Sequence, residues 1–175
     1  METDRLAPIR YVWDEFITAC KNNFVCSDSL TIDEQLMPFR GRSQFIQYNP
    51  QKTSKYGINI FWLCDFKFRY AANGDIYTGK EPRMPVKKDL AKNVVMKLTD
   101  YIHNSGRNIT MDNYFTSVPL AEDLLKKRLT IVGTIRNNKR EIPSIMKPNK
   151  SRSVCSSEFG FTKNMTMVSY VPKEK

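Results

Sequence analysis

The 175-residue sequence is poor in the side chains on which many enzyme and metal sites depend. It has a single histidine, His103, and four cysteines, Cys20, Cys26, Cys64 and Cys155, none of which share a C-x-x-C spacing. Histidine acid–base catalysis therefore has only one candidate residue, and a cysteine-based zinc site lacks paired ligands. We expect the cysteines to be reduced and mostly buried.

The sequence also lacks a run of apolar residues long enough to span a bilayer. The segment METDRLAPIR, residues 1–10, has no apolar core of the kind found in signal peptides. Hydrophobic residues nevertheless make up 41% of the chain and aromatic residues 11%, which is enough to build a folded core. We expect a soluble intracellular domain without a membrane partner.

Acidic residues are in the minority, which indicates an anionic partner. Lys and Arg number 28 against 18 Asp and Glu, so the formal net charge is +10. Nucleic acid is the most frequent partner of such chains, although basic proteins with other roles are common. The basic residues are dispersed as on a folded surface, in small groups: Arg40/Arg42, Lys52/Lys55, Lys87/Lys88, Lys126/Lys127/Arg128 and Arg136/Lys139/Arg140.

Hydrophobic periodicity predicts an α/β domain with the order β-β-β-α-β-α-β after an N-terminal helix. Residues 44–57 are interpreted as a connection, and Asn73-Gly74 leaves open a hairpin turn in place of the third strand. The predicted strands are 30–37, 57–65, 70–78, 108–112 and 129–136, and the predicted helices are 8–22, 87–104 and 117–128.

The chain divides into three predicted parts. Residues 1–28 form a helical lead-in, and residues 29–136 carry the α/β pattern. Residues 137–175 have a different character, with prolines, polar stretches and short β-like pieces at 158–162 and 165–171. We expect this last part to begin a small β-rich insertion.

Two acids occupy positions that matter in this layout. The order β-β-β-α-β-α-β is that of ribonuclease-H-like nucleic-acid enzymes, in which the first and fourth strands are neighbours. Asp33 lies on the first strand and Asp112 ends the fourth, 112 − 33 = 79 positions later. Converging carboxylates suit Mg²⁺ or Mn²⁺ and two-metal phosphodiester chemistry. Alternation places Glu34 on the opposite face from Asp33 and does not choose between them.

Several blocks of the sequence resemble the piggyBac family of DDE/DDD transposases and the proteins derived from it. The resemblance runs from about Leu6 to the last residue, and the blocks are DEQLMPFRGR, QYNPQKTSKYGINIFWLCD, YTGK, NITMDNYFTSVPLA and LTIVGTIRNNKREIP. It implies an incomplete ribonuclease-H-like fold, Mg²⁺ or Mn²⁺, cut-and-paste DNA transposition in the nucleus, and a homodimer for a full-length relative. Asp33 and Asp112 match the first two catalytic, metal-binding aspartates of the family.

The sequence also departs from the family pattern. The family's third catalytic aspartate lies on a later segment, beyond the insertion, and no residue here matches it. The later acids Glu141 and Glu158 are in no matching motif. We therefore expect a partial catalytic core that is inactive alone, with a decaying transposase copy as one explanation.

Alternatives remain for the site and for the function. Asp33 and Asp112 have a purely structural alternative as strand-end acids that cap turns or pair with arginine. Arg40, Arg42, Lys52 and Lys55 are candidate DNA-phosphate contacts or simply solvated surface. The competing function is a domesticated, non-catalytic DNA-binding or interaction protein.

Overall fold

The computed structural model describes residues 4–79, 89–147, 149 and 151–172. The chain forms two compact units, residues 1–134 and residues 135–175. No helix within the described residues is both long and apolar enough to cross a membrane.

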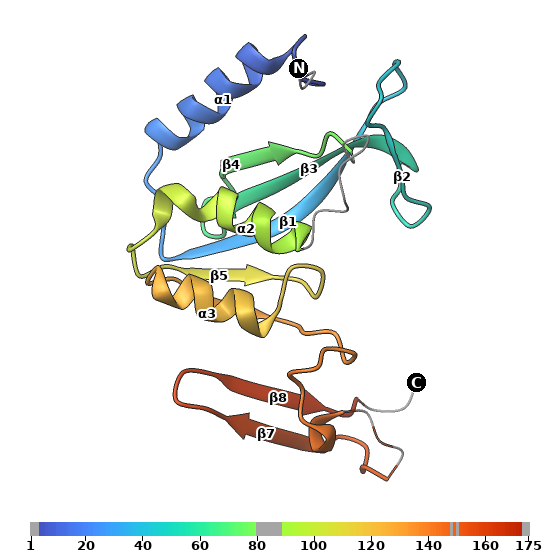
Figure 1. Ribbon diagram of the computed structural model, residues 1–175, viewed down its shortest axis with the longest axis vertical. Coiled ribbons are helices and arrows are strands. Elements are labelled where there is room, and N and C mark those ends of the chain that lie inside the picture. The colour runs from blue at the N-terminus through green and yellow to red at the C-terminus, as the bar shows by residue number, and fades with distance from the viewer. Residues whose placement is uncertain (1–3, 80–88, 148, 150, 173–175) are drawn as a thin grey trace. The chain divides into compact units, whose positions relative to one another are not determined.

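A six-stranded mixed sheet is the centre of the first unit (Figure 1). Its strands follow the order β2-β3-β1-β5-β6, and β4 pairs with the free part of β3. β1 is antiparallel to β3 and parallel to β5, which is in turn parallel to β6. The bounds are β1 Ser29–Pro38, β2 Gln47–Tyr48, β3 Tyr56–Asp65, β4 Ala71–Ile76, β5 Asn108–Met111 and β6 Thr130–Gly133. The predicted mixed α/β sheet is confirmed.

Three helices accompany the sheet at the places where periodicity predicts them. They are α1 Arg10–Asn22, α2 Leu90–Thr99, which continues as the 3-10 turn η1 Asp100–Ile102, and α3 Val118–Lys126. α3 begins as its sequence indicates, because the Ser117 hydroxyl accepts the Leu120 N–H at 3.4 Å. The predicted first residues of α2, 87 and 88, lie outside the described residues.

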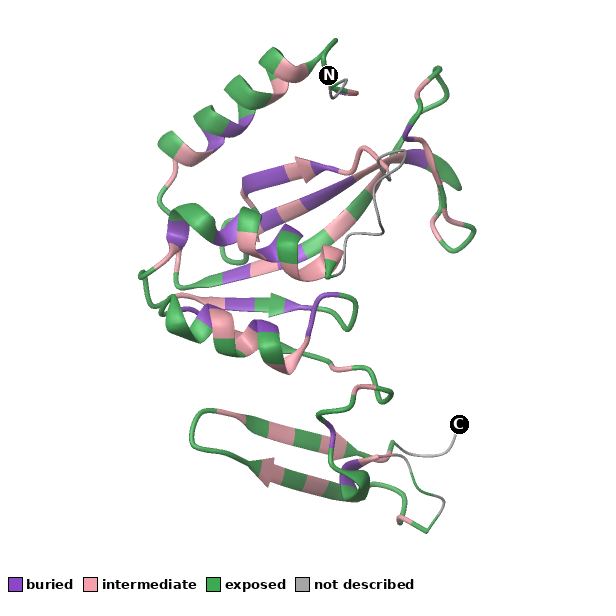
Figure 2. Cartoon of the chain, in the orientation of Figure 1, coloured by how far each residue is buried: buried purple, intermediate pink, exposed green. Residues whose placement is uncertain are grey.

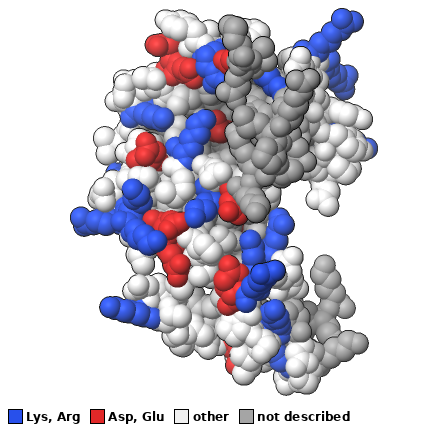
Figure 3. Space-filling model, viewed as in Figure 1, with Lys and Arg blue, Asp and Glu red and all other residues white. Residues whose placement is uncertain are grey.

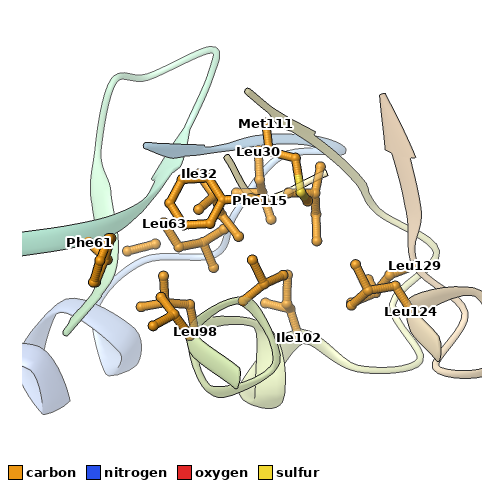
Figure 4. Packing of buried hydrophobic residues seen from close by; sticks show 14 of the residues in the cluster. Leu30, Ile32, Phe61, Leu63, Leu98, Ile102, Met111, Phe115, Leu124 and Leu129 are labelled. Carbon is orange, nitrogen blue, oxygen red and sulfur yellow. The ribbon is translucent and has the colours of Figure 1, made fainter. Parts of the chain in front are cut away.

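The main hydrophobic core lies between one face of the sheet and helices α2 and α3 (Figures 2 and 4). The alternating positions Leu30 and Ile32 of β1 point into it, as Ile109 and Met111 of β5 do. The helices contribute Val94, Val95, Leu98, Ile102, Leu120 and Leu124. Every second side chain along these strands points into this core, so the side chains between them lie on the other face of the sheet.

A second, smaller cluster covers part of that other face. Leu6, Phe45, Ile60 and Ile76 are buried there, with Trp13 and Trp62 packed against them. The Trp62 ring lies so close to Gly74 that a Cβ at that position would be 2.5 Å from it. The N-terminal helix α1 thus rests on the β3–β4 side, beside β4 (Figure 1).

Two sequence interpretations need correction. The connection expected at 44–57 contains the short strand β2, because Gln47 and Tyr48 find pairing partners in Gly57 and Tyr56. Asn73-Gly74 is no hairpin turn: β4 runs through it, and the buried Asn73 amide donates to the Leu98 carbonyl of α2 at 2.8 Å.

Helices α2 and α3 are also joined by an ion pair at their surface. The Asp123 carboxylate accepts hydrogen bonds from Lys92 of α2 and Lys126 of its own helix. These two ammonium groups lower the pKa of Asp123 to about 2. The pair orients the two helices that cover the core.

The second unit is built on a β-hairpin. It contains the 3-10 turn η2 Ser144–Met146 and the antiparallel strands β7 Ser157–Phe161 and β8 Thr166–Tyr170. Arg152 braces this hairpin by donating to the Ser169 carbonyl at 2.8 Å and to its hydroxyl at 2.7 Å.

Candidate functional site

The β1–β5 pairing brings the two predicted aspartates to the same level of the sheet. The last paired residues of the parallel ladder are Ile32 and Met111, and Asp33 and Asp112 follow them by one position. Neighbouring strands lie about 4.8 Å apart, so carboxylates at this level are close enough to share an ion. The register therefore juxtaposes residues that are far apart in the chain.

Both aspartates avoid the buried core. Ile32 and Met111 are buried, so alternation directs the next side chains to the opposite face of the sheet. Asp33 and Asp112 are both exposed. Neither forms an ion pair with any described residue. Pairing with arginine, one of the structural alternatives, finds no support within the described part of the chain.

Each carboxylate is oriented by the backbone. Asp33 Oδ1 accepts the N–H of Glu34 at 2.8 Å, and Asp112 Oδ1 accepts the N–H of Tyr114 at 2.9 Å. Asp112 therefore does cap a turn, as the structural alternative expects. In each residue Oδ2 has no hydrogen bond to another described residue. An oxygen on each side chain is thus available to a ligand.

The turn after Asp112 is fixed from both sides. The Thr116 hydroxyl donates to the Asp112 carbonyl at 2.7 Å, and the Thr116 N–H donates to the same oxygen at 3.1 Å. Gly133 of β6 lies against this turn: a Cβ there would be 2.4 Å from Thr116 Oγ1 and 2.6 Å from the Met111 carbonyl. Sequence analysis did not identify Thr116 or Gly133 as parts of the site.

Glu34 has a different role from its neighbour. Its side chain lies on the core side of β1, half-buried, and Lys52 Nζ lies 3.0 Å from its Oε1. Glu34 is thus a half-buried acid whose ion-pair partner is a lysine. Lys52, a predicted DNA contact, has its charge balanced by this acid.

The other predicted DNA contacts lie near the carboxyl end of β1. Arg40 and Arg42 follow the carboxyl end of β1, and Lys55 precedes β3 in a turn closed by the Asn49 N–H and the Lys55 carbonyl at 2.8 Å. All three side chains belong to exposed residues. In the view of Figure 3, basic and acidic side chains are interspersed, as the dispersed sequence groups predict.

Trp62 and Cys64 of β3 lie beside Asp33 on the face of the sheet opposite the main hydrophobic core, which we call the open face. Trp62 is the cross-strand partner of Asp33, and its Nε1–H donates to Gln35 Oε1 at 2.9 Å. Burial raises the pKa of the Cys64 thiol, and the negative charge of Asp33 raises it further. Cys64 therefore stays a neutral thiol next to the acid.

The donor set at this site fits a hard divalent cation in type but not in number. Two carboxylates on one open face are ligands of the kind that Mg²⁺ and Mn²⁺ prefer. No group of three or more His, Cys, Asp or Glu side chains suited to a metal occurs within the described residues. Asp33 and Asp112 thus offer two carboxylate ligands to one ion.

A basic hollow in the second unit was not singled out from the sequence. It has a volume of about 360 Å³ and is lined by Arg136, Asn138, Lys139, Arg140 and Glu141. The cations outnumber the single acid, so the hollow suits an anionic group such as phosphate. In the sequence, the clustered charges of RNNKRE, residues 136–141, could have indicated this hollow.

Comparisons with known proteins agree with this geometry. A family model described as Transposase IS4 matches residues 1–175. The chain is also similar to a piggyBac transposase whose structure was determined by cryo-EM in a synaptic complex with hairpin DNA, with 47% sequence identity and a TM-score of 0.91. That match covers 98% of this chain and 36% of the transposase, so the chain spans about a third of its length.

The family match over all residues, the structural similarity and the ribonuclease-H-like mixed sheet lead to one conclusion. The chain belongs to the IS4-type transposase family and is a piggyBac-type member of it.

Proposed function

We propose that this chain supplies the two-aspartate part of a metal-dependent transposase core that cleaves and joins DNA strands. The observation that supports the proposal is the register of β1 and β5, in which Asp33 and Asp112 each follow the last paired residues, Ile32 and Met111, by one position. Their Oδ2 atoms, which no other described residue hydrogen-bonds, would hold Mg²⁺ or Mn²⁺. When bound, such an ion supplies an activated water or hydroxyl and charge stabilisation at the phosphate.

The remaining residues of the site would orient DNA. Arg40 and Arg42 follow the carboxyl end of β1 and Lys55 precedes β3, and these exposed cations would bind backbone phosphates of a duplex that extends past the acids. Lys52 would contribute less, because Glu34 already balances its charge. The basic hollow around Arg136 and Lys139 offers a further phosphate contact in the second unit.

The wider biology follows from the family resemblance. DNA as the substrate, as transposon ends or target, supports a nuclear location. A homodimer for a longer protein rests on the resemblance alone. The division into a lead-in at 1–28, a core at 29–136 and an insertion from 137 onward is likewise proposed here.

A non-catalytic DNA-binding protein is the second candidate, favoured by the lack of a three-ligand group within the described residues.

Metal binding tests the proposal directly. Binding of Mn²⁺ to the 175-residue chain should be followed by electron paramagnetic resonance of the free ion. We expect Asp33→Asn and Asp112→Asn each to lower the Mn²⁺ affinity by about tenfold or more, since losing even an outer-shell partner typically costs that much. The isosteric amides keep the backbone contacts at Oδ1.

Asp28→Asn is the matched control. Asp28 is an exposed acid that precedes the opposite end of the same strand. It should leave the affinity unchanged. Equal Mn²⁺ binding by the wild-type chain and both site variants would exclude the acid pair as a metal centre and favour the non-catalytic candidate.

A further inference from the structure

The turn between β3 and β4 carries exposed aromatic and basic side chains that the candidate site does not use. Phe66 is 70% exposed and Phe68 is 58% exposed, and they alternate with the exposed cations Lys67 and Arg69. We call residues 66–69 the aromatic turn. Large exposed apolar side chains that gather in one place usually mark a binding surface.

A buried carboxylate holds this turn in one conformation. Asp65, only 1% exposed, accepts the Phe68 N–H at 2.8 Å through Oδ1 and the Ser27 N–H at 2.6 Å through Oδ2. Its own N–H donates to the Tyr70 carbonyl at 2.8 Å. The turn therefore presents its side chains without a large ordering cost on binding.

The aromatic side chains beside Phe66 support one another. Phe24 stacks on Tyr70 with ring centroids 4.2 Å apart, and it meets Phe68 edge-on at 5.8 Å. Lys67 Nζ lies 5.2 Å from the centre of the Phe68 ring. Phe66 makes no ring contact with any described residue. Phe66 is therefore the aromatic side chain of the turn that a partner would contact.

The aromatic turn is separate from the Asp33–Asp112 site. Asp65 pairs with Leu30, so the turn lies at the amino end of β1, whereas Arg40 and Arg42 follow its carboxyl end. Three residues of strand, about 10 Å, lie between Leu30 and the level of Asp33. A ligand at the turn would therefore occupy a different part of the first unit.

The charges at the turn favour a polyanion. Lys67 and Arg69 form no ion pair with any described residue. Lys21 is also near, with its Nζ 5.5 Å from the ring of Tyr101, which in turn contacts Cys26. Of the acids near these cations, Asp65 is buried by its backbone contacts, whereas Asp28 and Asp100, the residue before Tyr101, are exposed.

We propose that the aromatic turn is a second DNA contact, in which Lys67 and Arg69 bind phosphates on either side of the minor groove while Phe66 wedges against the base pairs. Apolar wedges flanked by cations are a known way of kinking a duplex from the minor groove. The inference rests on the proposed function in taking DNA as the partner. It adds a bending site at the amino end of β1, next to the part of the sheet that carries the acids.

The experiment uses the full 175-residue chain and a 30-base-pair duplex in EDTA. Affinity is measured by fluorescence anisotropy over a series of salt concentrations, and bending by energy transfer between dyes at the duplex ends. We expect Lys67→Gln/Arg69→Gln to weaken binding by about tenfold or more at low salt and to reduce the salt slope by about 2, one per lost phosphate contact. Phe66→Ala should abolish the bend, and Phe66→Leu should retain most of it.

Matched controls come from elsewhere in the chain. Lys127→Gln/Arg128→Gln removes the same two charges from another exposed turn, in which Arg128 has a φ of 55° like that of Arg69. Phe161→Ala removes a phenylalanine that is 71% exposed in the second unit. Both controls should leave the bend unchanged and should reduce affinity less than the aromatic-turn variants do.

Two results would overturn the inference. Wild-type bending and salt slope in the aromatic-turn variants would exclude DNA at this surface and point to a protein partner. Effects no larger than those of the controls would show that the turn contributes only general surface charge to DNA binding. Because EDTA removes divalent ions, either failure leaves the metal-binding test of Asp33 and Asp112 unaffected.

Discussion

At the scale of single residues, the candidate site depends on one position that has no side chain. Gly133 of β6 faces Met111 of β5 and lies against the turn that carries Asp112. A methyl group at this position would overlap the Thr116 hydroxyl and the Met111 carbonyl. One of these atoms belongs to the backbone, so the turn itself would have to move.

Gly133→Ala should therefore displace Asp112. We expect the free energy of unfolding to fall by about 1–3 kcal/mol, the usual range for overpacking, and the Mn²⁺ affinity to fall with it. Urea denaturation and Mn²⁺ titration measure the two effects. Val132→Ala is the control, because Val132 is the preceding residue and is 60% exposed. Full stability and full Mn²⁺ affinity in Gly133→Ala would show that the turn tolerates the methyl group.

Predictions about single residues succeeded where the sequence pattern itself determines the direction of a side chain. Alternation correctly separated Asp33 from Glu34 onto opposite faces of β1, but it could not say which face is open. That depends on α2 and α3, which cover the side of Leu30 and Ile32. The site role of Gly133 depends on its pairing with Met111 across β5 and β6, which no local pattern encodes. Thr116 contacts a residue only four positions earlier, but its two bonds to Asp112 follow from the turn conformation.

At the scale of elements, helix α3 shows how the covering layer is held on the sheet. Two adjacent leucines on it have opposite environments: Leu124 is completely buried in the main core, whereas Leu125 is 39% exposed. The helix therefore contributes stability through one stripe of side chains. Its capping serine and its Pro119 mark where that stripe begins.

Leu124→Ala and Leu125→Ala make a matched pair on this helix. We expect Leu124→Ala to lower the free energy of unfolding by about 2–5 kcal/mol, because it leaves a cavity in the core. Leu125→Ala should cost much less, since its side chain already contacts water. Urea denaturation monitored by circular dichroism compares them. Similar losses in the two variants would contradict the packing of α3 described above.

The elements themselves were largely predictable because hydrophobic period and caps are local signals. The strands at 29–38 and 56–65 and the three helices lie within a few residues of their predicted bounds. β2 was missed because a two-residue strand has no period to detect. β6 is shorter than predicted: it ends at Gly133, although the β-branched residues Thr134 and Ile135 that follow would suit a longer strand.

At the scale of the whole molecule, the described residues contain two carboxylates that we propose bind metal, and no group of three. The family resemblance implies a third aspartate on a later segment, and this chain covers 36% of the similar transposase. A two-metal site needs several anionic oxygens, because Mg²⁺ binds weakly to isolated carboxylates and keeps most of its waters. The contributions of other segments are not encoded in these residues and could not be predicted from them.

We therefore expect the 175-residue chain alone to cleave and join no DNA with Mg²⁺ or Mn²⁺. Even a small misplacement of reacting groups costs about 100-fold in rate, and a missing ligand should cost more. The measurement is a gel assay on labelled duplexes carrying transposon-end or random sequences. Nicking that disappears in both Asp33→Ala and Asp112→Ala would contradict the expectation and indicate that another acid, such as Glu141 or Glu158, completes the site.

The parallel pairing of β1 with β5 also has a consequence for the order in which the protein assembles. β1 and β3 can join early through a nearby connection, but β5 reaches β1 only after the whole segment between them has closed into a loop. The two aspartates therefore become neighbours late in folding, and a growing polypeptide has no paired acids to present to metal or DNA. A divalent ion that binds only the finished pair would in turn favour the folded chain, so the site would help to secure the long-range contact that creates it.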